Sequence, residues 1–270
     1  MVVFPPCKIN LGLHVTHKRP DGYHELETCF FPVPWTDILE IVSSDAFAFT
    51  TSGNNIPGEQ NSNLCVKAYN LLKKDFKLPS VVIHLHKIIP TGAGLGGGSS
   101  DAAFTLRLLN ALFQLDLPEQ KLMDYASILG SDCAFFVQDR PMLGRGRGEI
   151  LSDVEVSLAG KFLVLVKPDI HVSTAEAYAG IHPRTADYPI VESLQLPLTS
   201  WRSRIRNDFE GSVFKKFPAI AAIKEKLYAS GARYASMSGS GSTVFGIFES
   251  AVDLSNDFQG ATIWSGKIVS

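Results

Sequence analysis

The sequence lacks any long hydrophobic run, because no apolar stretch approaches the roughly 18 residues that a membrane-spanning helix needs. Residues 1–8 also lack the basic and apolar regions of a signal peptide. No internal repeat or low-complexity segment stands out. From these absences we do not expect a membrane-spanning, secreted or repeat protein, and we expect a cytoplasmic globular one.

Paired cysteines and an excess of charge are missing as well. The four cysteines, at positions 7, 29, 65 and 133, contain no C-x-x-C pair and no spacing typical of a disulfide framework or metal site. A reducing cytoplasm is the simple inference. The 25 Lys and Arg residues nearly balance the 27 Asp and Glu residues, for a formal net charge of −2. Nucleic-acid and membrane-surface binding usually require a basic excess, so neither partner is expected.

The composition provides enough apolar material for a sizeable core. Hydrophobic residues make up 45% of the 270 residues, which is ordinary for a globular protein. This length allows one large domain or two modest ones. We place a domain boundary near Asp153, which predicts an N-terminal domain over residues 1–153 and a C-terminal domain over residues 154–270.

The most informative stretch is the glycine-rich loop over residues 90–100. It follows an alternating apolar run, residues 81–89, and precedes a helical pattern, which predicts strand, loop and helix. Five glycines lie in this loop, and glycines leave backbone N–H groups open to a ligand. Ser99 or Ser100 is predicted to cap the helix, whose first N–H groups attract an anion. The loop therefore indicates a nucleotide phosphate site, and a long tight turn is the alternative.

Two familiar glycine loops do not fit. Gly92, Gly94 and Gly97 satisfy G-x-G-x-x-G, but the acidic residue near the required spacing, Asp116, falls in a loop rather than at the end of a second strand. The Walker pattern fails because Ser99, not lysine, follows the last glycine. A phosphate site of this kind must take its cation from elsewhere in the chain.

The polar face of the first long strand is a second candidate feature. Residues 9–15 alternate between apolar and polar side chains, which predicts a half-buried strand. Lys8 and Asn10 lie on its polar face, where they could line a cleft or simply face solvent. A turn signal at residues 18–22 joins this strand to residues 23–31, which predicts a hairpin.

The remaining elements follow from similar patterns. Residues 144–148 indicate a mobile connector or rim loop, and residues 182–200 indicate a proline-spaced loop. Strands are predicted over residues 37–42, 46–49, 161–166 and 244–248, and helices over residues 64–72, 119–129, 173–178 and 219–228.

Two further positions are candidates for function. Asp132 stands among small and aromatic residues, so it is either a cap for the next helix or a carboxylate in a partly desolvated pocket, suited to act as a base. Residues 237–243 form a second loop rich in glycine and serine, which could close over a nucleotide or be only a tight turn.

Three blocks together resemble the GHMP small-molecule kinase superfamily: residues 6–13, residues 90–103 and residues 237–241. The likeness covers residues 5–248. It is nearest to the branch whose acceptor alcohol carries cytidine diphosphate, through residues 18–24, 129–132 and 207–210. The resemblance implies an α+β fold of two domains, an N-terminal ribosomal-protein-S5-domain-2-like domain and a C-terminal ferredoxin-like domain, with the active site in the cleft between them.

The resemblance also implies the reaction. A member of this superfamily transfers the γ-phosphoryl group of ATP, with Mg²⁺, to an alcohol, here in isoprenoid precursor synthesis by the non-mevalonate route. Asp132 matches the family's general base and Lys8 the lysine that orients the reactants. Ser100 is a possible Mg²⁺ ligand, and no other protein ligand is expected. The ATP-binding residues implied are Pro90, Thr91, Gly92, Ala93, Gly94, Leu95, Gly96, Gly97, Gly98, Ser99 and Ser100.

The acceptor side is implied by the same resemblance. Tyr23 would stack on the cytosine, His24 would bond the base edge, and Tyr178 would cover the other face. The alternative is another GHMP kinase that acts on mevalonate, homoserine or a sugar, and a non-catalytic nucleotide-binding regulator is a third possibility. A monomer or weak homodimer is expected. Further residues implied are Asn10 and Thr174 for the substrate, and Ser238, Gly239, Ser240 and Gly241 for support of the nucleotide loop.

Overall fold

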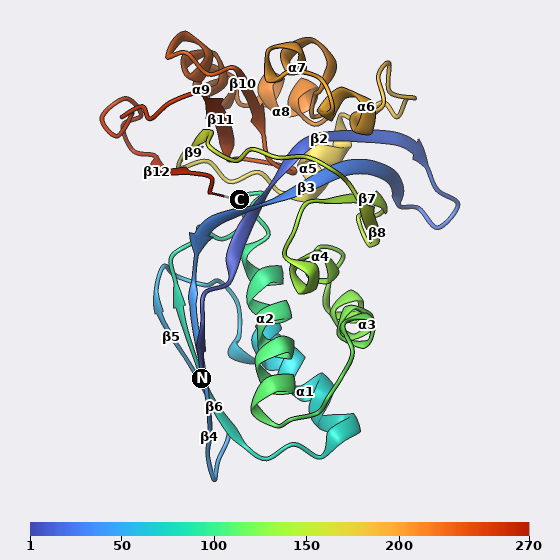
Figure 1. Ribbon diagram of the computed structural model, residues 1–270, viewed down its shortest axis with the longest axis vertical. Coiled ribbons are helices and arrows are strands. Elements are labelled where there is room, and N and C mark those ends of the chain that lie inside the picture. Colours follow the sequence, from blue (N-terminus) through green and yellow to red (C-terminus); the bar gives the residue numbers. More distant parts are fainter. Residues whose placement is uncertain (270) are drawn as a thin grey trace. The chain divides into compact units, whose positions relative to one another are not determined.

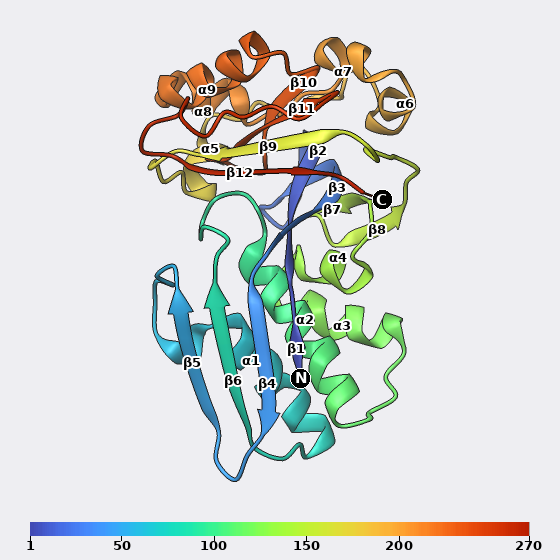
Figure 2. The same cartoon turned by 60° about the vertical axis from the view of Figure 1, so that its left-hand side comes forward.

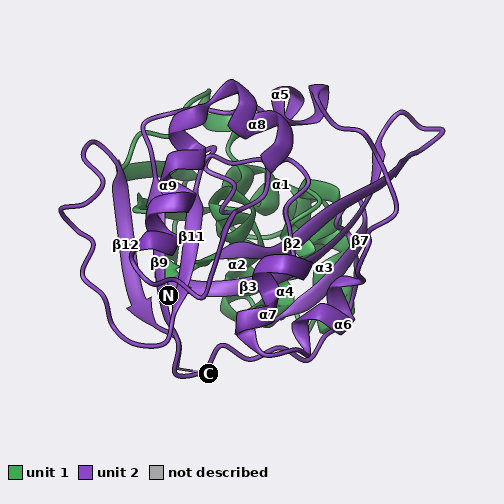
Figure 3. Cartoon of the chain, turned by 90° about the horizontal axis from the view of Figure 1, so that it is seen from above, with its two compact units in different colours: residues 1–7, 35–91, 96–140 green, residues 8–34, 92–95, 141–270 purple. Residues whose placement is uncertain are grey.

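The computed structural model describes residues 1–269, which form two compact units (Figure 3). This division differs from the single boundary expected after Asp153, because the chain passes from one unit to the other several times. Unit 1 comprises Met1–Cys7, Trp35–Thr91 and Gly96–Arg140, and unit 2 comprises Lys8–Pro34, Gly92–Leu95 and the residues from Pro141 onward.

Unit 1 contains a four-stranded sheet with helices on one face (Figure 2). Its central strand, β6, buries every second side chain, as the alternating sequence predicts. β6 pairs with β4 in the antiparallel sense and with β5 in the parallel sense. The strands lie in the order β1 (Val2–Val3), β4 (Ile38–Ser43), β6 (Val81–Lys87) and β5 (Ala48–Gly53).

The glycine loop leads into α2, a helix of unit 1 in which 10 of 16 residues are buried. The helix begins at Gly97 after Gly96, whose φ of 68° ends the loop in the left-handed region. The expected cap by Ser99 or Ser100 is therefore wrong, because both serines lie inside the first turn. The helices of this unit are η1 (Gln60–Ser62), α1 (Leu64–Phe76), α2 (Gly97–Leu112), α3 (Glu119–Leu129) and α4 (Cys133–Gln138).

Unit 2 contains most of a second four-stranded sheet, built on two long neighbouring strands, β2 and β3 (Figure 1). The turn at residues 18–22 joins them, which confirms the predicted hairpin. Residues 142–146 form a strand paired with β3, so the connector or rim loop expected at residues 144–148 is wrong for residues 144–146, while residues 147–149 form a turn. The order in this sheet is β2 (Pro6–Lys18), β3 (His24–Thr36), β7 (Met142–Gly146) and β8 (Ile150–Asp153).

The third sheet, also in unit 2, is antiparallel throughout. The apolar run predicted as a buried strand over residues 161–166 becomes β9, one of its two inner strands. The strands lie in the order β10 (Tyr234–Met237), β11 (Val244–Phe248), β9 (Phe162–Lys167) and β12 (Thr262–Lys267). The helices of unit 2 are α5 (Thr174–Ala179), α6 (Ile190–Leu194), α7 (Leu198–Arg204), α8 (Glu210–Lys216) and α9 (Pro218–Ala229).

Two expectations about unit 2 are wrong for identifiable reasons. The segment over residues 182–200 is not only loop, because Pro189 and Pro197 each precede a short helix, a position that proline tolerates well. Strand β2 is not half-buried, because residues 6–15 are buried on both faces. Its polar face is covered by the loop that follows β10.

No helix within residues 1–269 is long and apolar enough to cross a membrane.

Candidate active site

Backbone conformation explains most of the glycines in the glycine loop. Gly92, Gly94 and Gly96 have φ values of 62°, 77° and 68°, a region that other residues rarely adopt. A Cβ on Gly94 would lie 2.1 Å from the carbonyl oxygen of Ser238, and one on Gly97 would lie 3.0 Å from Lys87 Nζ. Backbone conformation or close packing therefore accounts for four of the five glycines without any ligand.

Gly98 is the exception. Its φ is ordinary, and a Cβ there would meet only a leucine methyl group at 3.9 Å. The residue is exposed in the first turn of α2, where backbone N–H groups have no partner within the helix. The fold does not require glycine at position 98. The absence of a side chain there leaves the backbone N–H open to close approach by a phosphate.

A cavity of about 330 Å³ opens beside this turn within unit 1. Its lining includes both apolar and polar residues, among them Lys87 and Asp101. The size suits a nucleoside. The lining residues are Phe49, Thr51, Ile56, Pro57, Gly58, Glu59, Gln60, Ser62, Asn63, Leu64, Lys87, Thr91, Gly98 and Asp101.

An ion triad lies in the lining and core of unit 1. Lys87, 2% exposed, donates to a carboxylate oxygen of Asp37 and to Asp101 Oδ2, the latter at 2.7 Å. The other oxygen of Asp37 accepts from the backbone N–H groups of Ile88 and Ile89, at 2.6 and 2.8 Å. The triad thus ties strand β6, the entry to the glycine loop and helix α2 together.

Asp132 lies directly before α4, in the turn that follows α3. Its side chain makes no capping hydrogen bond to α4, so the cap interpretation is not supported. A Cβ on Gly130 of the same turn would lie 3.2 Å from Cys133 Sγ and 4.0 Å from Ser99 Oγ. The turn that carries Asp132 is therefore packed close to the first turn of α2. Burial raises the pKa of Cys133 to about 12, so this neighbour is a neutral thiol.

Lys8 and Asn10 face the same side of β2 and are 3% and 1% exposed. Lys8 Nζ donates to Asn10 Oδ1 at 2.7 Å, and Asn10 Nδ2 donates to Thr28 Oγ1 at 2.9 Å. Thr28 Oγ1 in turn donates to the carbonyl of Gly12 at 2.6 Å. The solvent-facing alternative is wrong, because this face holds a buried and oriented ammonium group.

The second glycine loop contacts the first. The hydroxyl of Ser238 donates to the carbonyl of Gly94 at 2.8 Å, and its oxygen lies 3.4 Å from Asn10 Oδ1. The backbone N–H of Thr243 donates to the carbonyl of Ala93 at 3.2 Å. Gly239 follows with a φ of 55°, and a Cβ there would lie 3.5 Å from Lys8 Nζ. The loop is thus a support for residues 92–95 and for Lys8, which a tight turn alone would not explain. Ser240 and Gly241 complete it.

The residues assigned to the acceptor lie in unit 2. The His24 and Tyr178 rings are stacked, with centroids 4.8 Å apart, and Tyr178 meets the ring of Phe209 edge-on. Tyr23 is 55% exposed, and the guanidinium of Arg147 lies 4.9 Å from its ring centroid. His24 therefore occupies the Tyr178 face that was assigned to the base. Thr174 is exposed at the start of α5, after the cap Ser173.

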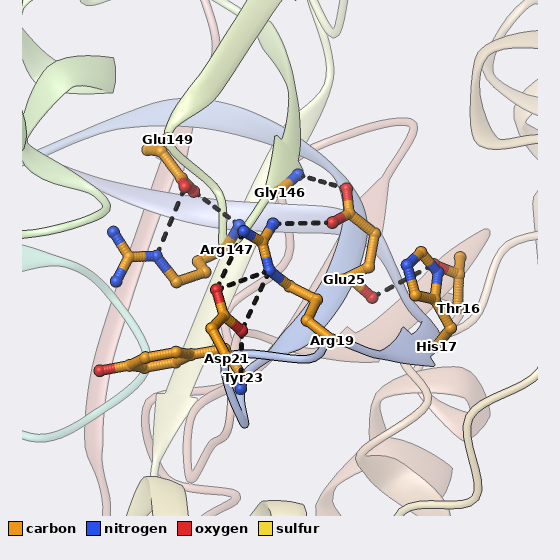
Figure 4. A network of polar contacts seen from close by, with 9 residues as sticks. All are labelled: Thr16, His17, Arg19, Asp21, Tyr23, Glu25, Gly146, Arg147 and Glu149. Carbon is orange, nitrogen blue, oxygen red and sulfur yellow. Dashed lines mark hydrogen bonds and ion pairs between the residues drawn. The ribbon is translucent and has the colours of Figure 1, made fainter.

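A polar network fixes the turn that carries Tyr23 (Figure 4). Arg19 bonds Asp21 at 3.1 Å and Glu25 at 3.0 Å, and Asp21 accepts from the backbone N–H of Tyr23 at 3.1 Å. Glu25 also accepts from the N–H of Gly146 at 2.8 Å. The hairpin turn is thereby attached to strand β7.

The donor set for Mg²⁺ is small. Within residues 1–269, no group of three or more His, Cys, Asp or Glu side chains could hold a metal ion. Ser100 Oγ is buried in the first turn of α2 and has no hydrogen-bond partner among the described residues. A single hydroxyl fits an ion held mostly by phosphates and water.

Sequence reasoning missed three groups of residues. The loop over residues 56–63 carries no motif, and only the cavity makes it relevant. Thr28 and Asp37 are ordinary strand positions in sequence. Lys87 gave a signal, because it continues the buried side of the alternating run in β6, where an unpaired lysine would be costly.

Two family models match the chain. The model for the N-terminal domain of GHMP kinases matches residues 63–140, and the model for the C-terminal domain of GHMP kinases matches residues 192–259. The first spans the glycine loop and Asp132, and the second spans the Met237–Gly241 loop.

Curated relatives match over nearly the whole chain. A protein of Cytophaga hutchinsonii named 4-diphosphocytidyl-2-C-methyl-D-erythritol kinase is 55% identical, over 92% of both chains. A protein of Bacteroides thetaiotaomicron with the same name is 51% identical, over 99% of both chains.

Solved structures agree. A crystal structure of 4-(cytidine 5'-diphospho)-2C-methyl-D-erythritol kinase is 32% identical, covers 100% of both chains and has a TM-score of 0.83. The mevalonate kinase of Methanococcus jannaschii has a TM-score of 0.72 at 13% identity over 100% of this chain and 98% of its own, a likeness of fold alone.

Proposed function

The chain belongs to the GHMP kinase family, and we propose that it uses ATP to phosphorylate the 2-hydroxyl of 4-diphosphocytidyl-2-C-methyl-D-erythritol, a step in non-mevalonate isoprenoid precursor synthesis. The observation that carries this proposal is the 55% identity over 92% of both chains with a relative named for that substrate. The 32% identical crystal structure of the same enzyme, matched over its full length, supports it.

The nucleoside of ATP binds in the cavity of unit 1, and its phosphates lie against the first turn of α2. The open position at Gly98 and the free N–H groups of that turn support this placement. Residues 90–96 shape the loop around the phosphates. When bound, Mg²⁺ would neutralise phosphate charge, and the Ser100 hydroxyl, which has no hydrogen-bond partner among residues 1–269, is one protein oxygen that could face it.

Asp132 and Lys8 carry the chemistry. Asp132 accepts the proton of the acceptor hydroxyl. The oxygen of that hydroxyl forms the new bond to the γ-phosphorus of ATP as the bond between the γ-phosphorus and the β,γ-bridging oxygen breaks, which releases ADP. Lys8 donates a hydrogen bond at this point and balances the developing charge. Its contact with Asn10 supports this role, because an ammonium held at 2.7 Å by a neighbour on the same strand is already oriented.

The cytidine end is held by unit 2. Tyr23 and Tyr178 supply the two stacking faces, His24 bonds the base edge, and Asn10 and Thr174 contact the rest of the substrate. Because His24 is stacked on Tyr178, the base enters as His24 turns from the ring face toward the base edge. The fixed turn around Arg19 supports Tyr23 as a stable face.

The test is an ADP-release assay on the purified chain with ATP, Mg²⁺ and one alcohol at a time. We expect turnover with the cytidine-linked alcohol and none with mevalonate, homoserine or galactose. Turnover with one of those alcohols instead would assign the chain to another branch of the family, and none with any would contradict a kinase role.

The same assay tests the base. Asp132→Ala should lose at least roughly 10²-fold in kcat, the usual scale for a general base, while ATP binding measured by calorimetry persists. Asp124→Ala, which removes an exposed carboxylate on α3, is the matched control and should keep full activity. Full activity in Asp132→Ala would remove that residue from its role.

A further inference from the structure

Residues 207–210, Asn-Asp-Phe-Glu, connect two separated parts of unit 2, and the proposed reaction makes no use of them. Asn207 is 2% exposed. Its Nδ2 donates to the carbonyls of Met237 and Gly239, both at 2.8 Å, and its Oδ1 accepts from the N–H of Phe209 at 3.0 Å. Two carbonyls on one side and an N–H on the other fix the orientation of the amide.

Glu210 holds the same loop from its other end. One oxygen of its carboxylate accepts from the hydroxyl of Ser236 at 3.0 Å and from the N–H of Met237 at 2.9 Å. The other oxygen pairs with Lys224 at 2.6 Å. The entry to the Met237–Gly241 loop is therefore held by two buried or half-buried side chains of one short segment.

The held loop leads directly to Lys8. Ser238, between the two carbonyls that Asn207 binds, donates to Gly94 at 2.8 Å and lies 3.4 Å from Asn10 Oδ1. That same oxygen accepts from Lys8 Nζ at 2.7 Å. Three side-chain contacts thus separate Asn207 from the ammonium group.

The strand that carries Lys8 is held by the segment as well. Leu13 forms a parallel bridge with Asn207, with Leu13 N–H donating to Arg206 at 2.9 Å and Asp208 N–H donating to Leu13 at 2.8 Å. Asp208 also accepts from the N–H of Val15 at 2.9 Å. Strand β2 and the Met237–Gly241 loop are therefore placed against one common reference.

We propose that Asn207 is a positioning residue for the kinase reaction: it fixes the Met237–Gly241 loop so that Ser238 keeps Gly94 and the Asn10–Lys8 pair in their reactive places. This inference rests on the proposed function. Only an amide supplies two N–H donors and one acceptor from so short a side chain. Asn207 touches no reacting atom, so its loss should act on turnover through misplacement of Lys8.

The test uses Asn207→Asp in the full chain, which keeps the size and the Phe209 contact but sets a carboxylate against two carbonyls. We expect kcat to fall by roughly 10- to 100-fold, the scale of a 1 Å misplacement, while KM for ATP and for the alcohol stays within about threefold. Amide hydrogen exchange of Gly241 and Thr243, whose N–H groups bond Ser238 and Ala93, should become faster.

Asn110→Asp is the matched control. Asn110, near the C-terminal end of α2, donates to Leu117 O at 3.3 Å and accepts from Leu117 N at 3.0 Å in the connection to α3, so the change has the same chemistry away from residues 207–210. It should lower Tm and leave kcat unchanged. An equal loss of kcat in both variants at equal Tm, or an unchanged kcat in Asn207→Asp, would overturn the proposal.

A second variant covers failure of Asn207→Asp to fold. Ser238→Ala keeps the loop backbone and removes the contacts with Gly94 and Asn10, so kcat should fall with little change in KM. An unchanged kcat would show that Ser238 does not connect Asn207 to Lys8. If wild-type protein turns over no cytidine-linked alcohol, the proposed function fails. Unchanged amide hydrogen exchange at Gly241 and Thr243 in Asn207→Asp would separately show that Asn207 does not hold the Met237–Gly241 loop.

Discussion

Lys87 places a positive charge between two carboxylates in the interior of unit 1. One ammonium cannot neutralise both Asp37 and Asp101, so the triad carries one excess negative charge when both acids are ionised. Burial, with Asp37 adding to it, raises the pKa of Asp101 to about 7 despite the contact with Lys87. The two acids outweigh burial at Lys87 and raise its pKa, so the lysine stays charged.

The raised pKa of Asp101 makes the free energy of unfolding fall as pH rises. Between the ordinary value of 3.8 and about 7, folded Asp101 binds a proton that the unfolded chain has released. Its contribution is therefore full at low pH and is lost as pH rises through 7. We expect wild-type protein to lose up to about 2 kcal/mol between pH 5.5 and 8 relative to Asp101→Asn, which cannot titrate. Urea unfolding at both pH values measures the difference.

Asp124→Asn is the control for this experiment, since it removes an exposed acid from α3. Its pH profile should run parallel to that of wild-type protein. A profile for Asp101→Asn that also runs parallel would mean that Asp101 is ionised throughout this range.

The two proposed catalytic residues, Lys8 and Asp132, and the ion triad differ in how much of each could be predicted from the sequence. The resemblance assigned Lys8 and Asp132, and nothing in the structure contradicts either. The alternating pattern shows that Lys87 points inward. It cannot identify Asp37, which lies 50 residues away, because that pairing depends on how β4 and α2 meet β6.

At the scale of elements, the glycines of the loop are expected to differ in role: Gly94 serves folding and Gly98 serves ligand binding. Gly94→Ala should unfold the protein more easily, by roughly 2 kcal/mol or more, because its Cβ would lie 2.1 Å from the Ser238 carbonyl and its φ is 77°. Denaturant unfolding measures this loss. A variant as stable as wild-type protein would show that the contact between the two loops is dispensable.

Gly98→Ala should behave in the opposite way. The new methyl group has room and alanine favours a helix, so stability should hold or rise by up to about 1 kcal/mol. If phosphates approach this amide, the Kd for ATP should rise by about tenfold, or about 1.4 kcal/mol. Calorimetric titration with a non-hydrolysable ATP analogue measures it, and an unchanged Kd would place the phosphates elsewhere.

Most elements could be predicted from periodicity and turn signals, including β6, the hairpin of β2 and β3, and α9. The exceptions have tertiary causes. The alternation of apolar and polar residues makes strand β2 look half-buried in the sequence. It is buried on both faces because its polar side chains contact residues far along the chain, such as Ser238. The serines after the glycine loop look like caps, yet Gly96 can end the loop earlier because it adopts a positive φ.

At the scale of the whole molecule, the two compact units are not two consecutive pieces of the chain. The boundary expected after Asp153 coincides with the last residue of β8, so it separates the second sheet from the third. Unit 2 instead contains most of both sheets, because Leu13 and Val15 of β2 share a hydrophobic core with β9, β10, β11 and α9. Periodicity shows where a strand is, but not which distant core receives its side chains.

This arrangement predicts that the chain survives a cut in the segment between β8 and β9. A protease site inserted after Glu155, in an exposed stretch outside any helix or strand, should yield two pieces that co-elute in gel filtration and keep kinase activity. The shared core and the hydrogen bonds of Leu13 and Val15 with Arg206 and Asp208 should hold them together. The uncut insertion variant is the control. Separation of the pieces under native conditions would show that β2 contributes little to that core.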